Sequence, residues 1–156
     1  MLRPKTDHYA PYYANYIKLV PEGDLFQLLE TEHQKTQAIL ATLDEAAGDF
    51  CYAENKWSIK ELLLHMLDTE QIMSYRALRI ARGDKTEMPG FEQDDYVAAV
   101  DASPLSLADL AADWQALRTH TLRLLKRFSK EVWEASGTAS NAPFSVRSLA
   151  FIILGH

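Results

Sequence analysis

The chain has 156 residues, enough for one domain with a substantial hydrophobic core. Its 16 basic and 22 acidic side chains give a net charge of −6, which argues against a nucleic-acid-binding surface. The single cysteine, Cys51, excludes an intrachain disulfide and suits a reducing compartment. Residues 1–13 lack the apolar core of a secretory signal, and no apolar run is long enough to span a bilayer. We therefore expect one cytoplasmic domain over residues 1–156.

Residues 1–23 predict an irregular N-terminal arm with one short turn, because prolines recur along the segment. Four tyrosines in the same segment indicate that the arm packs against the body of the protein. A helix is expected next, over residues 24–47, with Asp24 as its N-cap and Gly48 at its end. His33 lies among charged and polar neighbours in that helix, which favours a solvated side chain.

A helix over residues 58–83 carries the clearest local signals in the chain. Ser58 and Glu61 have the spacing of a capping box, and Trp57 and Leu62 have that of a hydrophobic staple. Apolar residues recur along one face of this helix, and Gly83 ends it. The predicted face comprises Ile59, Leu62, Met66, Met73, Ala77 and Ile80.

The second half of the chain predicts two more helices, at residues 105–129 and from Ser145 onward. Between the second and third helices, residues 84–102 form a connection with a short turn at 93–100. Its length makes it a candidate to line or cover a site. Residues 130–144 read as a second connection, and no segment shows the alternation of a strand. The expected fold is therefore all-α, a four-helix bundle.

Two histidines are expected to face the interior of this bundle. His156 shares its helical face with the apolar residues three, four and seven positions before it, and His65 lies beside the apolar face of the 58–83 helix. A lone histidine in such a place is more often a hydrogen-bonded core residue. Two of them on different helices favour a metal site, because bundles build metal sites from facing helices. Glu61 and Asp68 are the carboxylates placed to orient His65, although the capping box and solvent also account for them.

Two histidines fall short of the three protein ligands that a catalytic zinc-type site uses. The remaining candidates are His120, a carboxylate, or a residue beyond His156, where a ligand four positions on would share its face. For His120 itself, a surface or packed side chain is the favoured interpretation. The apolar pattern is unbroken at the final FIILGH, so the last helix is expected to be truncated.

The 58–83 helix also carries three arginines at regular spacing. Arg76, Arg79 and Arg82 could bind an anion, but a solvated face with Glu70 and Asp84 as partners is favoured.

Five stretches of the chain carry a family pattern: WSIKELLLHMLDTE at 57–70, YRALRIARGD at 75–84, PGFEQDDYV at 89–97, GTASNAPFSVRSLAFIILGH at 137–156 and the arm at 9–25. Together and in this order they resemble the DinB-like family, also called DinB/YfiT-like metalloenzymes. It implies an up-down-down-up bundle with a zinc-type or nickel-type ion held by three histidines. His65 matches the first and His156 the second, while the third falls four positions after His156. It also implies a homodimer, and some relatives are thiol-S-transferases.

Two functions of different classes follow from the histidine pair together with this resemblance. The first is a divalent-metal-dependent enzyme acting on a small molecule, in which a metal-activated water or thiol is the nucleophile of a transferase or hydrolase. The second is a non-catalytic bundle that binds a small ligand or protein partner, with His65 and His156 as core residues. Metal content is the observation that separates them.

Overall fold

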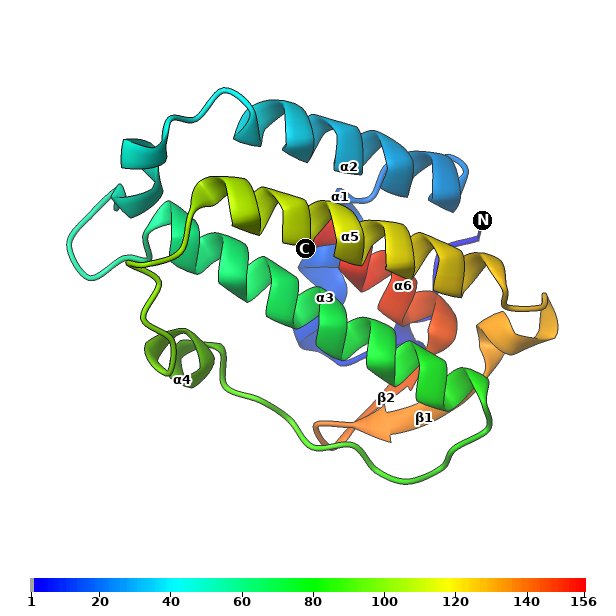
Figure 1. Cartoon of the computed structure of the whole chain (residues 1–156). Helices are drawn as coiled ribbons and strands as arrows, with labels where there is room; N and C mark the ends of the chain where they lie inside the picture. The colour runs from blue at the N-terminus through cyan, green and yellow to red at the C-terminus, as the bar shows by residue number, and fades with distance from the viewer. Residues whose placement is uncertain (1) are drawn as a thin grey trace.

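Four helices lie side by side in the computed structural model, which describes residues 2–156 (Figure 1). They are α2 (Leu25–Leu40), α3 (Ile59–Ala81), α5 (Leu107–Lys126) and α6 (Val146–Gly155). Helices α3 and α5 run in one direction and α2 and α6 in the other, which is the predicted up-down-down-up order (Figure 1). Because α3 and α5 are parallel, the chain between them must return along the bundle. That return segment contains the short helix α4 (Gln93–Ala98), where the sequence predicts a turn.

Side-chain caps fix where the bundle helices begin. Ser58 and Glu61 form the predicted capping box: the Ser58 backbone N–H donates to the Glu61 carboxylate at 2.7 Å, and Glu61 N–H donates to Ser58 Oγ at 3.2 Å. The Asp24 carboxylate accepts two backbone N–H groups at the start of α2. Ser145 caps α6 reciprocally with Ser148. These contacts satisfy N–H groups that have no partner within the helix.

The first bundle helix is shorter than predicted. It ends at Leu40 rather than near residue 47, and a 3₁₀ turn, η3 (Glu45–Asp49), follows. Thr42 Oγ1 donates to the carbonyl of Ile39 at 2.7 Å, and the Asp44 carboxylate accepts the N–H of Ala47 at 2.9 Å. Short polar side chains that bond to the nearby backbone in this way compete with continued helix.

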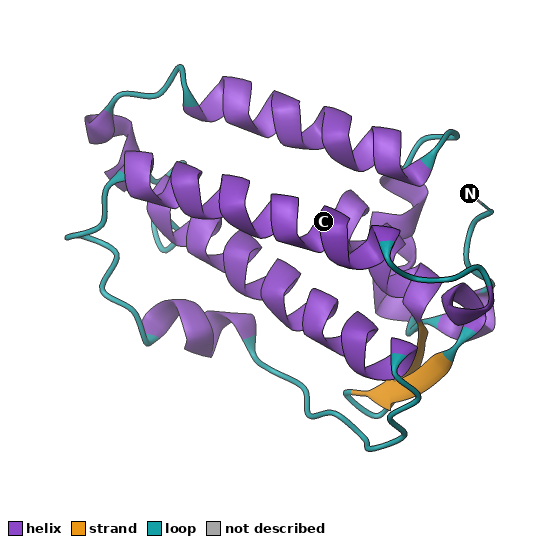
Figure 2. Cartoon of the chain, turned by 45° about the vertical axis from the view of Figure 1, so that its right-hand side comes forward, coloured by secondary structure: helices purple, strands orange, loops and turns teal. Residues whose placement is uncertain are grey.

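A β-hairpin replaces part of the predicted irregular connection before α6. Strands β1 (Ser136–Ala139) and β2 (Ala142–Ser145) pair antiparallel after a 3₁₀ turn, η4 (Glu131–Glu134) (Figure 2). The two turn residues, Ser140 and Asn141, have φ values of 51° and 57°, the left-handed conformation of a tight hairpin turn. Met88 pairs with β1 on its other side through two backbone hydrogen bonds of 3.0 Å. The expectation of no strands was therefore wrong, because four-residue strands are too short to show alternation.

The predicted apolar face of α3 is correct in its second half and wrong in its first. Met73, Ala77 and Ile80 are buried, but Leu62 is 47% exposed while its neighbour Leu63 is buried. Helix α3 packs against both α5 and α6, and its first turns direct Leu63 and Leu67 toward Leu110 and Trp114 of α5. The burial face therefore differs from the predicted one near the helix start.

The N-terminal arm is more regular than predicted. Two 3₁₀ turns, η1 (Thr6–His8) and η2 (Pro11–Tyr13), precede a short helix, α1 (Ala14–Leu19). Its aromatic residues do pack against the body: the ring of Tyr13 meets that of Phe144 edge-on, with centroids 5.4 Å apart. Among residues 2–156 no helix is long and apolar enough to cross a membrane.

Candidate functional site

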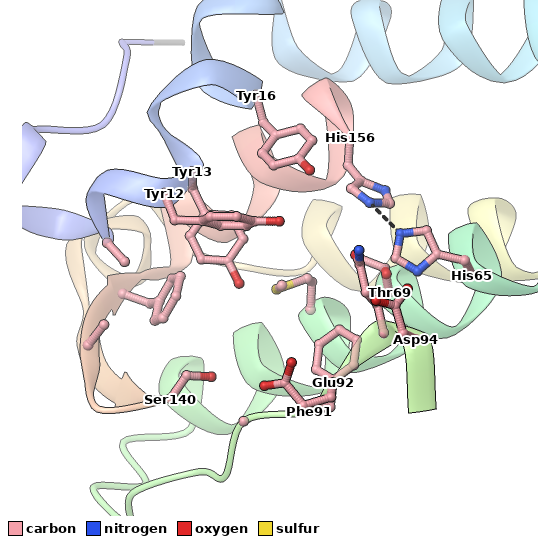
Figure 3. A pocket seen from close by; sticks show the side chains of 16 residues that line it. Tyr12, Tyr13, Tyr16, His65, Thr69, Phe91, Glu92, Asp94, Ser140 and His156 are labelled. Carbon is pink, nitrogen blue, oxygen red and sulfur yellow. Dashed lines mark hydrogen bonds between the residues drawn. The ribbon is translucent and has the colours of Figure 1, made fainter. Parts of the chain in front are cut away.

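The predicted pair of histidines meets inside the bundle. Nε2 of His65 lies 3.0 Å from Nε2 of His156, although 91 positions separate the residues in the sequence (Figure 3). His65 is in the second turn of α3 and is 8% exposed. His156 follows α6 as its C-cap, and its backbone N–H continues the helical bonding to Ile152 at 2.9 Å. The opposing directions of α3 and α6 bring these two positions together.

Aromatic rings hold both imidazoles from outside the pair. Trp57 lies against His65 with centroids 4.9 Å apart, and Tyr16 lies against His156 at 5.3 Å. Tyr16 can approach because residue 155 is glycine: a Cβ there would stand 2.0 Å from the Tyr16 carbonyl oxygen. The capping residues of α3 and the N-terminal arm thus restrict how the two histidine rings can turn.

Burial keeps both imidazoles neutral near pH 7. It lowers the pKa of His156 to about 4, and the neighbouring His65 adds to this effect. Burial also lowers the pKa of His65, and the carboxylates of Asp68 and Asp94 partly offset this effect by raising it. Asp68 is itself affected, since burial raises its pKa. A neutral imidazole has a free nitrogen lone pair, which is the form that binds a metal ion.

The pair opens onto a cavity of about 430 Å³. The N-terminal arm forms one wall with Tyr12, Tyr13 and Tyr16, and the connection before α4 forms the opposite wall (Figure 3). The remaining lining comes from α3 and from the hairpin. Thr69 and Met73 belong to α3, and Ser140, Ala142 and Phe144 belong to the hairpin. The connection and the start of α4 contribute Gly90, Phe91, Glu92, Gln93 and Asp94, and the arm also contributes Ala10. Residues 90–94 of the 84–102 connection thus line this cavity, and that the cavity is a functional site stays a prediction.

The remaining candidate ligands do not complete a metal site with the pair. Within residues 2–156 no group of three or more His, Cys, Asp or Glu side chains is placed to hold a metal ion. His120 is exposed on α5, as the favoured interpretation had it. His33 is half-buried rather than solvated, and burial lowers its pKa. Glu61 is occupied by the capping box, so of the two predicted orienting carboxylates only Asp68 acts on His65.

The arginines of α3 do not form one solvated face. Arg76 is 2% exposed and donates to the Pro89 carbonyl at 2.8 Å and to Ser140 Oγ at 3.2 Å. Arg79 pairs with Asp84 as predicted, with its Nε 2.6 Å from the carboxylate. Glu70 was assigned the wrong partner: it forms a buried pair with Arg118 of α5, with bonds of 2.7–3.0 Å.

Sequence reasoning missed the arm tyrosines, Phe91 and Asp94 as cavity residues. A signal for the tyrosines was present, since four of them occur in a short arm that was expected to pack. Asp94 gave no comparable signal, because two other acidic residues surround it at the start of a short helix.

Comparisons with known proteins agree with this architecture. The chain matches YfiT from Bacillus subtilis with a TM-score of 0.67 and 12% sequence identity, over 99% of this chain and 85% of that one. YfiT is described as a probable metal-dependent hydrolase with an unusual four-helix bundle topology. The predicted bundle fold is thereby confirmed. No curated protein matches the chain. The family model of the DinB superfamily matches residues 28–156, and the chain therefore belongs to the DinB superfamily.

Proposed function

We propose that this protein is a divalent-metal-dependent enzyme in which His65 and His156 supply two of the metal ligands. The observation that carries the proposal is the 3.0 Å separation of their Nε2 atoms. Two nitrogens bound to one ion at about 2.0–2.1 Å stand roughly 3.0–3.4 Å apart in common coordination geometries. The same type of ring nitrogen faces inward from both residues, both rings are neutral, and both line the cavity. The donor set therefore fits a zinc-type or nickel-type ion.

The ion's contribution, when bound, is to lower the pKa of a water or thiol so that it becomes a nucleophile at neutral pH. The chain's own residues position the ligands and enclose the substrate. Trp57 and Tyr16 hold the two imidazoles in position, and the Asp68 charge favours a basic His65. The arm and the 90–94 segment enclose the space beside the histidines, where a small substrate can bind.

Hydrolysis and thiol transfer are the two reactions we propose for this site. The description of YfiT as a probable metal-dependent hydrolase supports the first, and the family resemblance supports the second. Turnover of ester or amide substrates against thiol conjugates separates them. A third histidine ligand, four positions after His156, stays a prediction.

The decisive experiment is the metal content of the purified protein and of His65→Ala, measured by plasma mass spectrometry. We expect close to one ion per site in the native protein and a large loss in the variant. His120→Ala is the matched control, because His120 is exposed on α5 and should leave the metal content unchanged. Metal content that survives His65→Ala would support the alternative, a non-catalytic bundle with packed core histidines.

We also propose that the protein forms a homodimer, which the family resemblance implies. An exposed apolar patch beside a surface hollow supports this: Phe50 is 61%, Tyr52 74% and Leu62 47% exposed. Contiguous apolar surface of this kind often marks an interface. Light scattering should give the mass of two chains, and Phe50→Asp should reduce it. Ile39→Asp, at another exposed apolar position, is the control.

A further inference from the structure

We propose that the cavity beside the histidines selects a substrate that carries a cationic group, such as an ammonium or quaternary amine. The inference rests on the proposed function, because it assumes that this cavity is where the substrate binds. It is carried by two features of the lining: the sign of its charged side chains and the number of its aromatic rings.

The charged groups on the cavity surface are carboxylates. Glu92 and Asp94 line it, and no lysine or arginine does. The guanidinium of Arg76 lies directly behind the lining: it is buried between Phe91 and Phe144, donates to Pro89 and Ser140, and interacts electrostatically with Tyr13. Its charge offsets part of the negative potential at a distance. A ligand in the cavity can contact the two carboxylates directly, and these negative groups attract a cation.

Asp94 is not explained by its helix alone. Acidic residues are favourable in the first turn of a helix, which accounts equally for Asp94 and Asp95 of α4. Only Asp94 of these two lines the cavity. Glu92 likewise precedes α4, but its side chain makes no capping hydrogen bond. Both carboxylates are exposed and remain free for a ligand.

Aromatic rings face these carboxylates across the cavity. Tyr12, Tyr13 and Tyr16 form the opposite wall, with centroid distances of 5.0–6.2 Å and ring planes at 42–89° to one another (Figure 3). The faces of Phe91 and Phe144 are already used by Arg76, whose Cζ lies 5.9 Å from each ring. Tyr16 packs on His156 and Tyr13 packs against Phe144, so Tyr12, which is 64% exposed, is the ring most open to a ligand. Tilted aromatic rings opposite a carboxylate are a recurrent way to bind ammonium groups.

The histidines set the direction in which such a substrate lies. They stand at one end of the cavity with Asp94 beside them, and Glu92 lies farther from them along the facing wall (Figure 3). A cation would be repelled by a divalent ion at the histidines. The cationic group is therefore placed between Glu92 and the tyrosines, and the reacting group of the substrate at the histidine end.

The test uses three probes of one shape and different charge: choline, neutral 3,3-dimethylbutan-1-ol and anionic 3,3-dimethylbutanoate. Saturation-transfer NMR and titration on the native protein measure their binding. We expect choline to bind best, with an affinity about tenfold above the neutral probe, the size of a partly desolvated cation–π and carboxylate contact. Glu92→Gln should weaken choline about threefold or more, Asp94→Asn should weaken it by less because Asp94 lies beside His65, and both should leave the neutral probe unchanged.

Matched controls remove a charge outside the cavity. Asp95→Asn neutralises the neighbour of Asp94 on the same helix, and Glu87→Gln neutralises an exposed residue of the same connection. Both should bind choline as the native protein does. Equal binding of the three probes, preference for the anion, binding of none, or no loss in Glu92→Gln and Asp94→Asn would overturn the proposal. Metal content of the same samples reports on the proposed function separately, so either can fail while the other stands.

Discussion

Gly155 lies directly against the backbone of Tyr16, and a Cβ at position 155 would stand 2.0 Å from the Tyr16 carbonyl oxygen. This contact joins the end of α6 to the N-terminal arm next to His156. The two aromatic rings that pack on the histidines both come from segments outside the bundle helices: Tyr16 from the arm and Trp57 from the residues before α3. The geometry of the histidine pair is a property of those segments as well as of the bundle.

Gly155→Ala should displace either the arm or the end of α6, because no side-chain rotation relieves a clash with backbone. We expect a loss of about 1–3 kcal/mol in the free energy of unfolding, together with reduced metal content. Gly90→Ala is the control, since its Cβ would come no nearer than 3.2 Å to the Ser140 side chain and 3.9 Å to the Ser140 backbone. Urea denaturation and metal analysis check the result, and an unchanged metal content in Gly155→Ala would contradict it.

The sequence predicts the features that depend on local contacts. The caps at Asp24, Ser58 and Ser145 are encoded within four residues, and the order of four helices follows from apolar spacing and breakers. His65 and His156 could be identified because each shares a helical face with core residues. Their placement on different helices favoured a shared metal site, and the family resemblance then added the expectation of three histidine ligands.

What the sequence did not reveal depends on contacts between distant segments. Arg76 reads as one of three evenly spaced surface arginines, and only the approach of Pro89 and Ser140 makes its burial possible. The hairpin is stabilised in part by Met88, about 50 positions earlier. Asp94 enters the site because the connection folds back over α3. No local pattern carries this information.

Stability of the metal-free protein should fall as the pH is lowered from about 6.5 toward 4. The folded state holds the pKa of His156 at about 4, below its ordinary value of 6.5, so the unfolded chain binds more protons in this window. More protons in the unfolded state means that stability rises with pH. The lowered pKa of His65 acts in the same direction.

Urea denaturation of chelator-treated protein between pH 4 and 7 measures this slope. His156→Asn removes the group that titrates and should make the dependence shallower across the window. An equal slope in the native protein and the variant would show that other groups control the acid sensitivity.

Glu70→Gln should be far more destabilising than the loss of a surface ion pair. Glu70 and Arg118 are each 3% exposed, and the substitution leaves the Arg118 guanidinium buried without its counter-charge. We expect a loss of about 3–5 kcal/mol in the free energy of unfolding. Glu30→Gln breaks the exposed pair with Lys126 and should cost no more than about 1 kcal/mol. Similar costs in thermal or urea denaturation would refute the distinction.

Arg76→Met should loosen the connection that lines the cavity, because Arg76 joins α3 to Pro89 of that connection and to Ser140 of the hairpin turn. The methionine keeps apolar contact with Phe91 and Phe144 but provides no donor, so the carbonyl of Pro89 loses its partner. Hydrogen exchange of residues 86–92 should accelerate, with a stability loss of about 1–3 kcal/mol. Arg82→Met, at an exposed position of the same helix end, should change neither quantity. Equal exchange in both variants would mean that the backbone pairing of Met88 with the hairpin is sufficient to hold this wall of the cavity.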